Sequence, residues 1–212
     1  MGAAFVSGNV RMKTRAADRM DQQKLDRAIG RRLKTLRTQA GMTLNELASR
    51  SGVSRAMIGR VERTQSSATA ALLNKLCSAL DVSLSDVVAL SEKPPERLTR
   101  LADQPQWRDP DSGYRRRHAS PVDAASGIEI IVVDLPAGAR VPYSPWGRSA
   151  FTQQLLMLEG AVCVHIDAKT VRLRDGDCLD FDVMRAVIFE NETKHDARYV
   201  IITRRGTSYG KM

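Results

Sequence analysis

The chain has 212 residues, enough for two domains, and carries 33 Lys and Arg against 24 Asp and Glu, a formal net charge of +9. Its 3 cysteines are too few for a disulfide framework. No apolar run approaches the roughly 20 residues of a membrane span or follows a charged start as in a secretory signal. We therefore expect a soluble, cytoplasmic protein without membrane contact.

The positive charge is concentrated in the N-terminal part of the chain. Residues 1–90 contain 15 Lys and Arg against 7 Asp and Glu, whereas residues 113–212 contain 14 against 12. Such an excess on one region is typical of nucleic-acid binding. Residues 1–20 are basic but weakly patterned, and we expect a disordered leader there; a mobile arm along DNA is the alternative.

Two helices joined by a tight turn are predicted for residues 43–63, after a longer helix over residues 22–39 with a leucine-rich face. Thr43 and Glu46 have the spacing of a capping box, which starts a helix. Gly52 can adopt the left-handed conformation that ends one, and Ser54 is a good N-cap for the next. A helix-turn-helix follows from this pattern.

The second of these helices has the character of a DNA-reading helix. Its apolar residues Met57, Ile58 and Val61 predict a buried stripe. The outer, N-terminal side then carries small residues, which allow close approach to DNA, and arginines, which bind guanine edges and phosphates: Ser54, Arg55, Ala56, Gly59 and Arg60. An ordinary helical hairpin with solvated arginines is the alternative.

Two more helices are predicted downstream, over residues 70–80 and 85–90. The resulting five-helix unit, residues 21–90, resembles the lambda-repressor-like family, or XRE class, in its VSRAMIGRVER segment and in the TQSSAT loop. The resemblance implies phosphate contacts from Asn45, where many members have glutamine, and from the loop 64–67. The predicted DNA-binding residues are Thr43, Asn45, Ser54, Arg55, Ala56, Gly59, Arg60, Arg63 and Thr64.

Residues 91–112 change in composition and contain four of the 8 prolines. We expect a fairly stiff linker with a short helix around residues 96–102. From residue 113 the apolar period becomes two. Many short strands at regular spacing indicate an all-β sandwich or barrel over residues 113–212. The predicted strands are 128–135, 151–158, 161–167, 170–173, 178–181, 186–189 and 198–204.

This C-terminal part is similar to the cupins, small double-stranded β-helix barrels. Gly160, Gly176 and Asn191 stand at the spacing of the two cupin motifs. The four metal-ligand positions of those motifs fall on Trp146, Arg148, Gln153 and Val187. Tryptophan and valine cannot ligate, arginine repels a cation, and glutamine is a weak donor. We therefore expect no metal and no cofactor, and surface or structural roles for the histidines His118, His165 and His195.

An effector pocket is the expected replacement for the metal site. An aromatic wall, an arginine fork and an orienting amide suit a small organic, possibly anionic molecule. The predicted pocket residues are Tyr143, Trp146, Arg148, Phe151, Gln153, Arg185 and Val187. The alternative is a barrel filled by its own side chains.

The fold class expected is thus α + β in two domains, a five-helix DNA-binding domain and an all-β cupin barrel. The function expected is a homodimeric transcriptional regulator that binds double-stranded operator DNA under the control of a small-molecule effector, because symmetry doubles the contacts of one small module. Two alternatives remain: a metal-dependent cupin enzyme with an appended helix-turn-helix, and an effector-free DNA-binding module.

Overall fold

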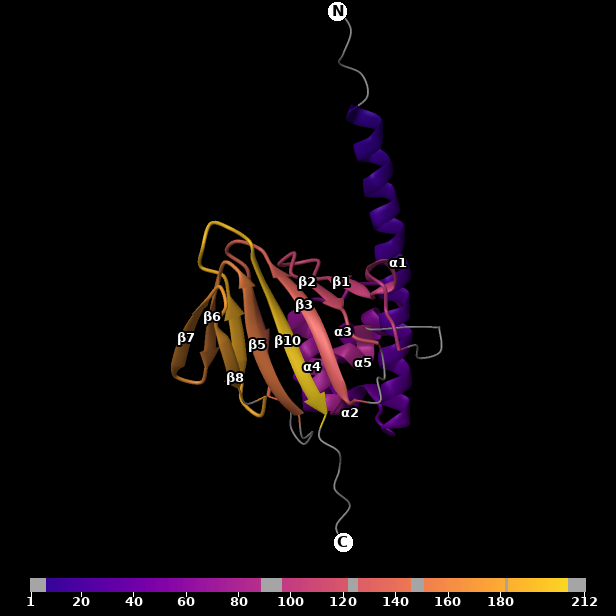
Figure 1. Cartoon of the computed structure of the whole chain (residues 1–212). Coiled ribbons are helices and arrows are strands. Elements are labelled where there is room, and N and C mark those ends of the chain that lie inside the picture. The colour runs from indigo at the N-terminus through magenta and orange to yellow at the C-terminus, as the bar shows by residue number, and fades with distance from the viewer. Residues whose placement is uncertain (1–6, 89–96, 122–125, 146–150, 182, 206–212) are drawn as a thin grey trace, which may run out of the picture.

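A computed structural model describes residues 7–88, 97–121, 126–145, 151–181 and 183–205. Five helices form the N-terminal half, and two antiparallel sheets form the C-terminal half, in agreement with the predicted fold class. The helices α2 to α5 lie behind strands β3 and β10 in Figure 1. No helix in the described part of the chain combines the length and apolar character that crossing a membrane requires.

The first helix, α1, spans Ser7–Gln39 and is longer than predicted. Residues 7–20 belong to this helix and are not the disordered leader that their weak patterning suggested. The physical reason is composition, since the segment has no proline and is rich in Arg, Lys, Ala and Met, which favour helix even without an amphipathic stripe. A search for apolar periodicity does not register a helical segment of this composition.

The four shorter helices are α2 (Leu44–Ser51), α3 (Arg55–Glu62), α4 (Ala70–Leu80) and α5 (Leu84–Val88). The predicted caps are present. Thr43 and Glu46 form a reciprocal capping box, Gly52 ends α2 with φ 65°, and the Ser54 hydroxyl accepts from the Met57 N–H. Ser83 and Asp86 cap α5 in the same reciprocal way.

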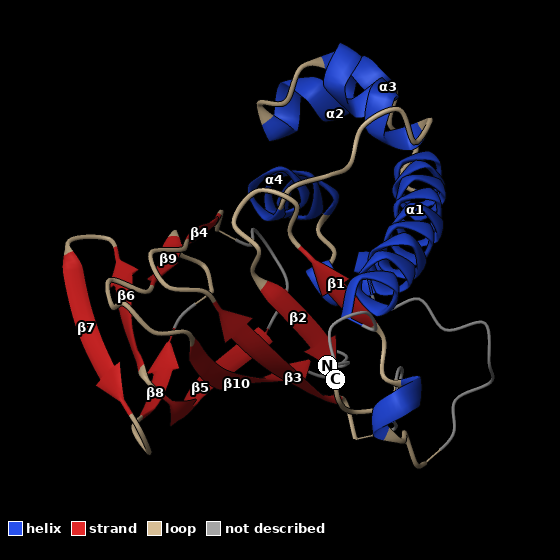
Figure 2. Ribbon diagram, turned by 90° about the horizontal axis from the view of Figure 1, so that it is seen from above, coloured by secondary structure: helices blue, strands red, loops and turns tan. Residues whose placement is uncertain are grey.

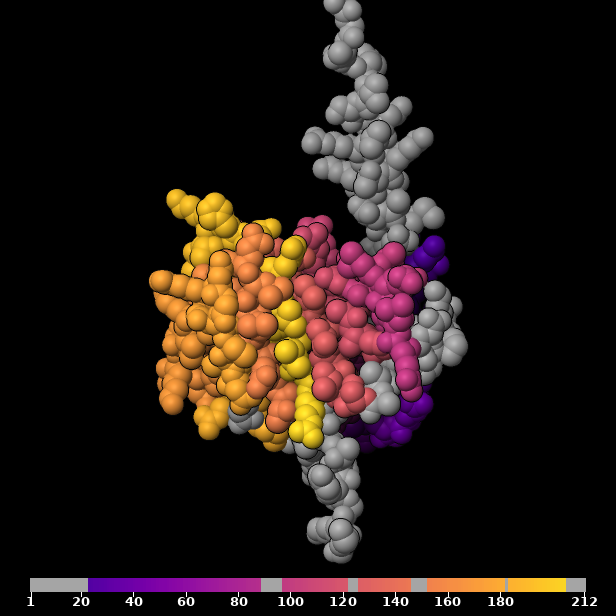
Figure 3. Space-filling view, in the orientation of Figure 1, coloured from indigo at the N-terminus to yellow at the C-terminus, as the bar shows by residue number. Residues whose placement is uncertain are grey.

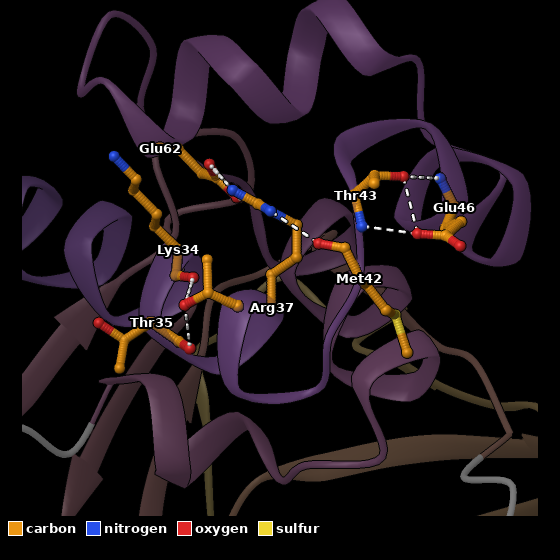
Figure 4. A network of polar contacts seen from close by, with 8 residues as sticks. Lys34, Thr35, Arg37, Met42, Thr43, Glu46 and Glu62 are labelled. Atoms are coloured by element: carbon orange, nitrogen blue, oxygen red, sulfur yellow. Dashed lines mark hydrogen bonds and ion pairs between the residues drawn. The ribbon is translucent and has the colours of Figure 1, made fainter.

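A buried ion pair joins helices α1 and α3 in the helical domain. Arg37 donates to both carboxylate oxygens of Glu62 at 2.7 and 3.0 Å and to the Met42 carbonyl at 2.7 Å (Figure 4). The two side chains are only 10% and 6% exposed, so Arg37 is a structural residue. The hydrogen bond to Glu62 raises the pKa of Arg37, which keeps the pair ionised.

Close backbone contact between α1 and α3 depends on a glycine. A Cβ atom built on Gly30 would lie 2.5 Å from the Val61 carbonyl oxygen, closer than a side chain tolerates. Gly30 therefore lets α1 pass directly against the C-terminal end of α3. This contact sets the position of α3 relative to α1.

The C-terminal half consists of ten strands in two sheets. A six-stranded sheet has the order β1-β2-β3-β10-β5-β8, and a four-stranded sheet has the order β4-β9-β6-β7. Buried residues alternate along the strands and fill the space between the sheets. The strands are β1 (Gln106–Arg108), β2 (Arg115–His118), β3 (Ile128–Leu135), β4 (Arg140–Tyr143), β5 (Phe151–Glu159), β6 (Ala161–Ile166), β7 (Lys169–Arg174), β8 (Cys178–Phe181), β9 (Val187–Glu190) and β10 (Ala197–Arg205).

Part of the predicted linker belongs to the sheet, which corrects the sequence reading. Strand β1 lies inside residues 91–112 and pairs with β2, and its Trp107 is 2% exposed. A short 3₁₀ helix, η1 (Leu101–Asp103), replaces the predicted helix of residues 96–102 as far as the described residues extend. A strand of three residues is too short to show alternation, so the sequence could not reveal it.

The residues that suggested a cupin fix the turns of the sheets. Gly160 has φ 87°, and a Cβ there would lie 3.1 Å from the Asp196 carbonyl oxygen. Gly176 has φ 83° in the turn before β8. Asn191 is fully buried, and its side-chain amide donates to the carbonyls of Leu135 and His195.

The two halves are joined along α4. Figure 2 shows α4 between the α2–α3 pair and the sheets. The buried Asp109 carboxylate accepts from the Ala70 N–H at the start of α4 at 2.9 Å, and the Asn74 amide donates to the Pro142 carbonyl at 3.0 Å. Ser78 near the end of α4 donates to the Pro145 carbonyl. These contacts span the helix, so the barrel and the helical domain form a direct interface.

Candidate DNA-reading helix and barrel cavity

Helix α3 lies on the side of the helical domain that faces away from the sheets (Figure 2). Its Ile58 and Val61 are buried in the helical core. Arg55, Ala56 and Arg60 are exposed on the other face of the helix. The two arginines therefore project from the surface that the barrel leaves accessible, as a helix entering a major groove requires.

The remaining predicted DNA-binding residues surround this face. Thr43, Asn45, Ser54 and Arg63 are exposed, and Thr64 is half-buried with a φ of 60°. Gly59 differs from expectation because it is buried. A Cβ there would lie 3.0 Å from the Arg63 guanidinium, which covers it. Close approach of DNA at Gly59 thus requires Arg63 to swing outward, as the far end of a flexible side chain can.

Two of the predicted contacts are already engaged within the protein. The Thr43 hydroxyl accepts from the Glu46 N–H and donates to the Glu46 carboxylate. In the loop before α4, the Ser67 hydroxyl donates to Asp26 of α1 at 2.6 Å. A phosphate contact from the Ser67 hydroxyl would have to replace that bond, and the backbone N–H groups of Thr64 and Gln65 already donate to the Val61 and Arg60 carbonyls.

A cavity lies between the two sheets, close to the helical domain. The empty space inside it and at its open mouth amounts to about 510 Å³, of which the enclosed part is small. Most of its wall is apolar, and the wall includes one residue of helix α5. The lining residues are Leu84, Arg116, Tyr143, Ser144, Gln153, Phe181, Val183, Arg185, Val187, Phe189, Tyr199 and Ile201.

Four of the seven predicted pocket residues meet at this cavity: Tyr143, Gln153, Arg185 and Val187. Trp146 and Arg148 lie outside the described residues, as does the side chain of Phe151. Arg185 forms an ion pair with Asp167 at 2.6 Å and is 58% exposed, so it belongs to the mouth of the cavity and not to its floor.

The buried cation of the cavity is Arg116, which the sequence did not single out. It projects inward from β2 and is 8% exposed. Its guanidinium donates to the Ser85 hydroxyl of α5 at 2.8 Å and interacts with the hydroxyl groups of Tyr114 and Tyr143. The β2 sequence RRRH has no apolar residue, so its alternation gave no indication of which arginine points inward.

Tyr143 lines the cavity beside Arg116, and Tyr114 supports it from outside the lining. The hydroxyls of Tyr114 and Tyr143 lie 2.8 Å apart, and the Tyr143 ring packs edge-on against Phe189. Burial raises the pKa of Tyr143 well above its ordinary value, with Tyr114 adding to the shift. The Tyr143 phenol therefore stays neutral near pH 7, and the charge at this end of the cavity comes from Arg116.

Gln153 and Val187, which stand at two of the cupin metal-ligand positions and lie in the described part of the chain, have other roles. The Gln153 amide donates to the Thr203 hydroxyl at 3.0 Å, and Val187 is buried in the wall. His165 does meet acidic partners, which the sequence spacing did not indicate: its Nε2 lies 3.0 Å from Glu190, and Glu192 is near.

That His165 cluster lies on the sheet face opposite the cavity, because Glu190 alternates with the cavity residues Val187 and Phe189. Arg140 and Arg172 form ion pairs with Glu190 and Glu192. These permanent cations already neutralise the carboxylates that a metal ion would need. The other histidines match their predicted structural or surface roles, with His118 buried against the Ser120 carbonyl and His195 exposed.

Residues 33–87 match the HTH_3 helix-turn-helix family. This match covers helices α2, α3 and α4 with their caps, most of α5 and the end of α1. The helical half is a helix-turn-helix domain of the HTH_3 family. Within it, α3 occupies the position of the second helix of the motif, the helix that reads DNA in such domains.

Relatives share both halves of the chain. The HTH-type transcriptional regulator SutR of Escherichia coli strain K12 is 27% identical over 169 residues, which cover 80% of this chain and 90% of SutR. An HTH_3 family transcriptional regulator from Vibrio cholerae is 24% identical and superimposes with a TM-score of 0.71 over 88% of this chain and 99% of that structure. This likeness shows that the two proteins share a fold in which a helical domain is followed by a β domain.

A more distant similarity is to the cupin domain of an XRE family transcriptional regulator from Enterobacter cloacae. It is 13% identical with a TM-score of 0.42, over 44% of this chain and 98% of that domain. That similarity is too low to add to the comparison. The strand pairing by itself shows the two-sheet architecture.

Proposed function

We propose that this chain is a homodimeric, sequence-specific DNA-binding transcriptional regulator whose operator affinity changes when a small organic effector binds in the barrel cavity. The exposed face of α3 carries this proposal. Arg55 and Arg60 project from a helix that is capped, packed on α1 and α2, and turned away from the barrel. The HTH_3 match and the regulator relatives support DNA as the partner.

The test compares arginines of α3 with an arginine of the barrel. Duplexes that bind the wild-type protein are selected from random sequence, and their affinity is measured at physiological salt. Arg55→Ala or Arg60→Ala is expected to weaken selected duplexes by at least tenfold, because one bidentate guanine contact contributes about 1–3 kcal/mol. Arg174→Ala removes the same charge from exposed strand β7 and should leave the affinity unchanged. Unchanged binding by both α3 variants would contradict the recognition-helix assignment.

The homodimer is supported by the outer face of the larger sheet, which faces the viewer in Figure 3. On this face Ile128, Ile130 and Leu158 are 39%, 40% and 47% exposed. The register places half-buried apolar residues beside them, so the face forms one apolar surface across β3, β10 and β5: Val132, Leu156, Val200 and Ile202.

A second copy of the chain is the occupant that fits this surface. The surface ends in Asp134, which pairs with Arg115 and Arg198, so charges of both signs border it and suit a two-fold, self-complementary contact. Two copies also supply the two half-sites that one small module needs for operator affinity. Ile130→Asp is expected to convert the dimer to a monomer in light scattering, whereas Ser49→Asp, on exposed α2, should not. A dimer that survives Ile130→Asp places the interface elsewhere.

The cavity is proposed as a binding site and not a catalytic one. Gln153 is engaged by Thr203, and Val187 offers no donor, so the described part of the barrel brings no set of metal ligands to the cavity. The competing proposal is a metal-dependent cupin enzyme. Metal analysis of the purified protein decides between them, since stoichiometric iron, zinc or manganese that is lost with a cavity substitution such as Gln153→Leu would favour the enzyme.

A further inference from the structure

We propose that Arg116 is the anion-binding residue of the cavity, and that a small organic carboxylate bound there touches the DNA-binding domain directly through helix α5. The inference rests on the proposed function and identifies the chemical class of its effector. It adds to the predicted arginines one that the sequence did not single out, Arg116 of β2, which lines the cavity.

The chemistry of the cavity selects the ligand class. Arg116 is buried, and no carboxylate among the described residues forms an ion pair with it. Glu129 contributes a charge–charge attraction without an ion-pair contact. A buried guanidinium costs free energy that an anion can recover, and its planar fork matches a carboxylate. Burial raises the pKa of its neighbour Tyr143, which therefore keeps its proton, and the mutual bond between the Tyr143 and Tyr114 hydroxyls leaves one O–H proton of the pair to donate to the same anion.

The rest of the wall selects what is attached to the carboxylate. Phe181, Phe189, Tyr199 and Ile201 surround the cavity together with valines, and Gln153 supplies an amide at one side. A compact apolar body with one carboxylate head complements this arrangement, because most of the wall is apolar.

Helix α5 forms part of the same site. Leu84 lines the cavity, and the next residue, Ser85, receives the 2.8 Å hydrogen bond from Arg116. A carboxylate at Arg116 competes for the guanidinium, and the attached apolar body meets Leu84. Binding therefore changes the contacts of α5 without any intermediate element.

Hydrogen bonds continue from α5 through α1 to the proposed DNA-reading helix α3. Arg32 of α1 donates to the Asp86 carbonyl of α5 at 2.9 Å, and Arg37 of the same helix holds Glu62 of α3. A shift of α5 is thus transmitted to the helix on which α3 rests. Because coupling is reciprocal, operator DNA should change carboxylate affinity by the same factor as the carboxylate changes operator affinity.

The first experiment measures the thermal stability of the full chain with acetate, isobutyrate and benzoate, each compared with its neutral amide at constant pH and ionic strength. At least one carboxylate is expected to raise the melting temperature more than its amide, because a ligand of the folded state stabilises it. In Arg116→Met this preference should disappear, with at least tenfold weaker binding, while Arg174→Met retains it. No preference for any carboxylate in the wild type, a measurement that needs no variant to fold, overturns the proposal.

The second experiment measures operator affinity with and without the preferred carboxylate. Ser85→Ala keeps Arg116 and should bind the carboxylate within about threefold of wild type, but the effect on operator affinity should fall toward unity. An undiminished effect in Ser85→Ala removes the α5 link. Carboxylate binding without any operator binding would overturn the proposed function alone, and an operator response to neutral ligands only would overturn this inference alone.

Discussion

The helical domain and the barrel present their chemistry in opposite ways. Arg55 and Arg60 project outward from one short helix, so neighbours in sequence are neighbours on the surface. Arg116, Tyr143 and Gln153 come from three different strands and point into one cavity. The helical domain therefore depends on how one helix is held, whereas the barrel depends on how distant segments converge, and substitutions should separate the two.

The largest expected effect comes from breaking the buried ion pair. Glu62→Ala leaves the Arg37 guanidinium buried without its carboxylate and should lower the free energy of unfolding by about 3–5 kcal/mol. Urea unfolding measures the loss, and operator affinity should fall with it. The double variant Arg37→Met with Glu62→Met should recover much of the stability. A single variant as stable as wild type would mean that the pair does not hold α1 against α3.

Two glycines of the helical domain give a matched pair with different outcomes. Gly30→Ala places a Cβ against the Val61 carbonyl and should cost about 1–3 kcal/mol by overpacking. Gly59→Ala meets only the movable Arg63 side chain, so helix propensity should stabilise it by up to about 1 kcal/mol.

Operator binding sharpens this comparison. Gly59→Ala, although stable, should weaken operator affinity, because its added methyl group lies on the face proposed to approach DNA. Thermal unfolding and operator titration of both variants test the pair. Equal stability of the two would contradict the close contact at Gly30, and full operator affinity in Gly59→Ala would place DNA elsewhere on α3.

The smallest expected effect concerns the cap of α2. Thr43→Ala should lower the free energy of unfolding by about 1 kcal/mol, the usual contribution of an N-cap.

The backbone and hydroxyl of Thr43 hydrogen-bond the Glu46 carboxylate and lower its pKa. A depressed carboxyl pKa contributes stability above the ordinary value of 4.5, and this contribution is lost as pH falls through the folded-state pKa. The stability difference between wild type and Glu46→Gln, measured from pH 7 to pH 3, should therefore shrink with acid; a constant difference would exclude the capping carboxylate as its source.

Local signals predicted the helical domain well. Thr43 with Glu46, Gly52 and Ser54 each act within four residues, and the structure contains all of these caps. The strand of residues 178–181 and the helix of residues 70–80 coincide with β8 and α4. The start of α1 was missed because its sequence has no clear apolar period.

The barrel cavity was predicted only in part, for a different physical reason. The cupin spacing selected Gln153 and Val187, which line the same cavity, since motif positions relate strand to strand. It could not find Arg116, because β2 lies outside those motifs and has charged residues on both faces. The sequence also gave no indication that Leu84 and Ser85 lie at the cavity. A helix of one domain becomes part of the other domain's site only when the two domains pack together, as α4 does on β4.

The sequence by itself determined the two domains, their order, the caps of the helix-turn-helix and the arginines of its second helix, because these depend on local backbone preference and on charge. Only the tertiary structure decided which arginine is buried at the cavity and that α5 closes one side of it. Contacts between segments far apart in the chain depend on the packing of the whole core, and no local pattern records them.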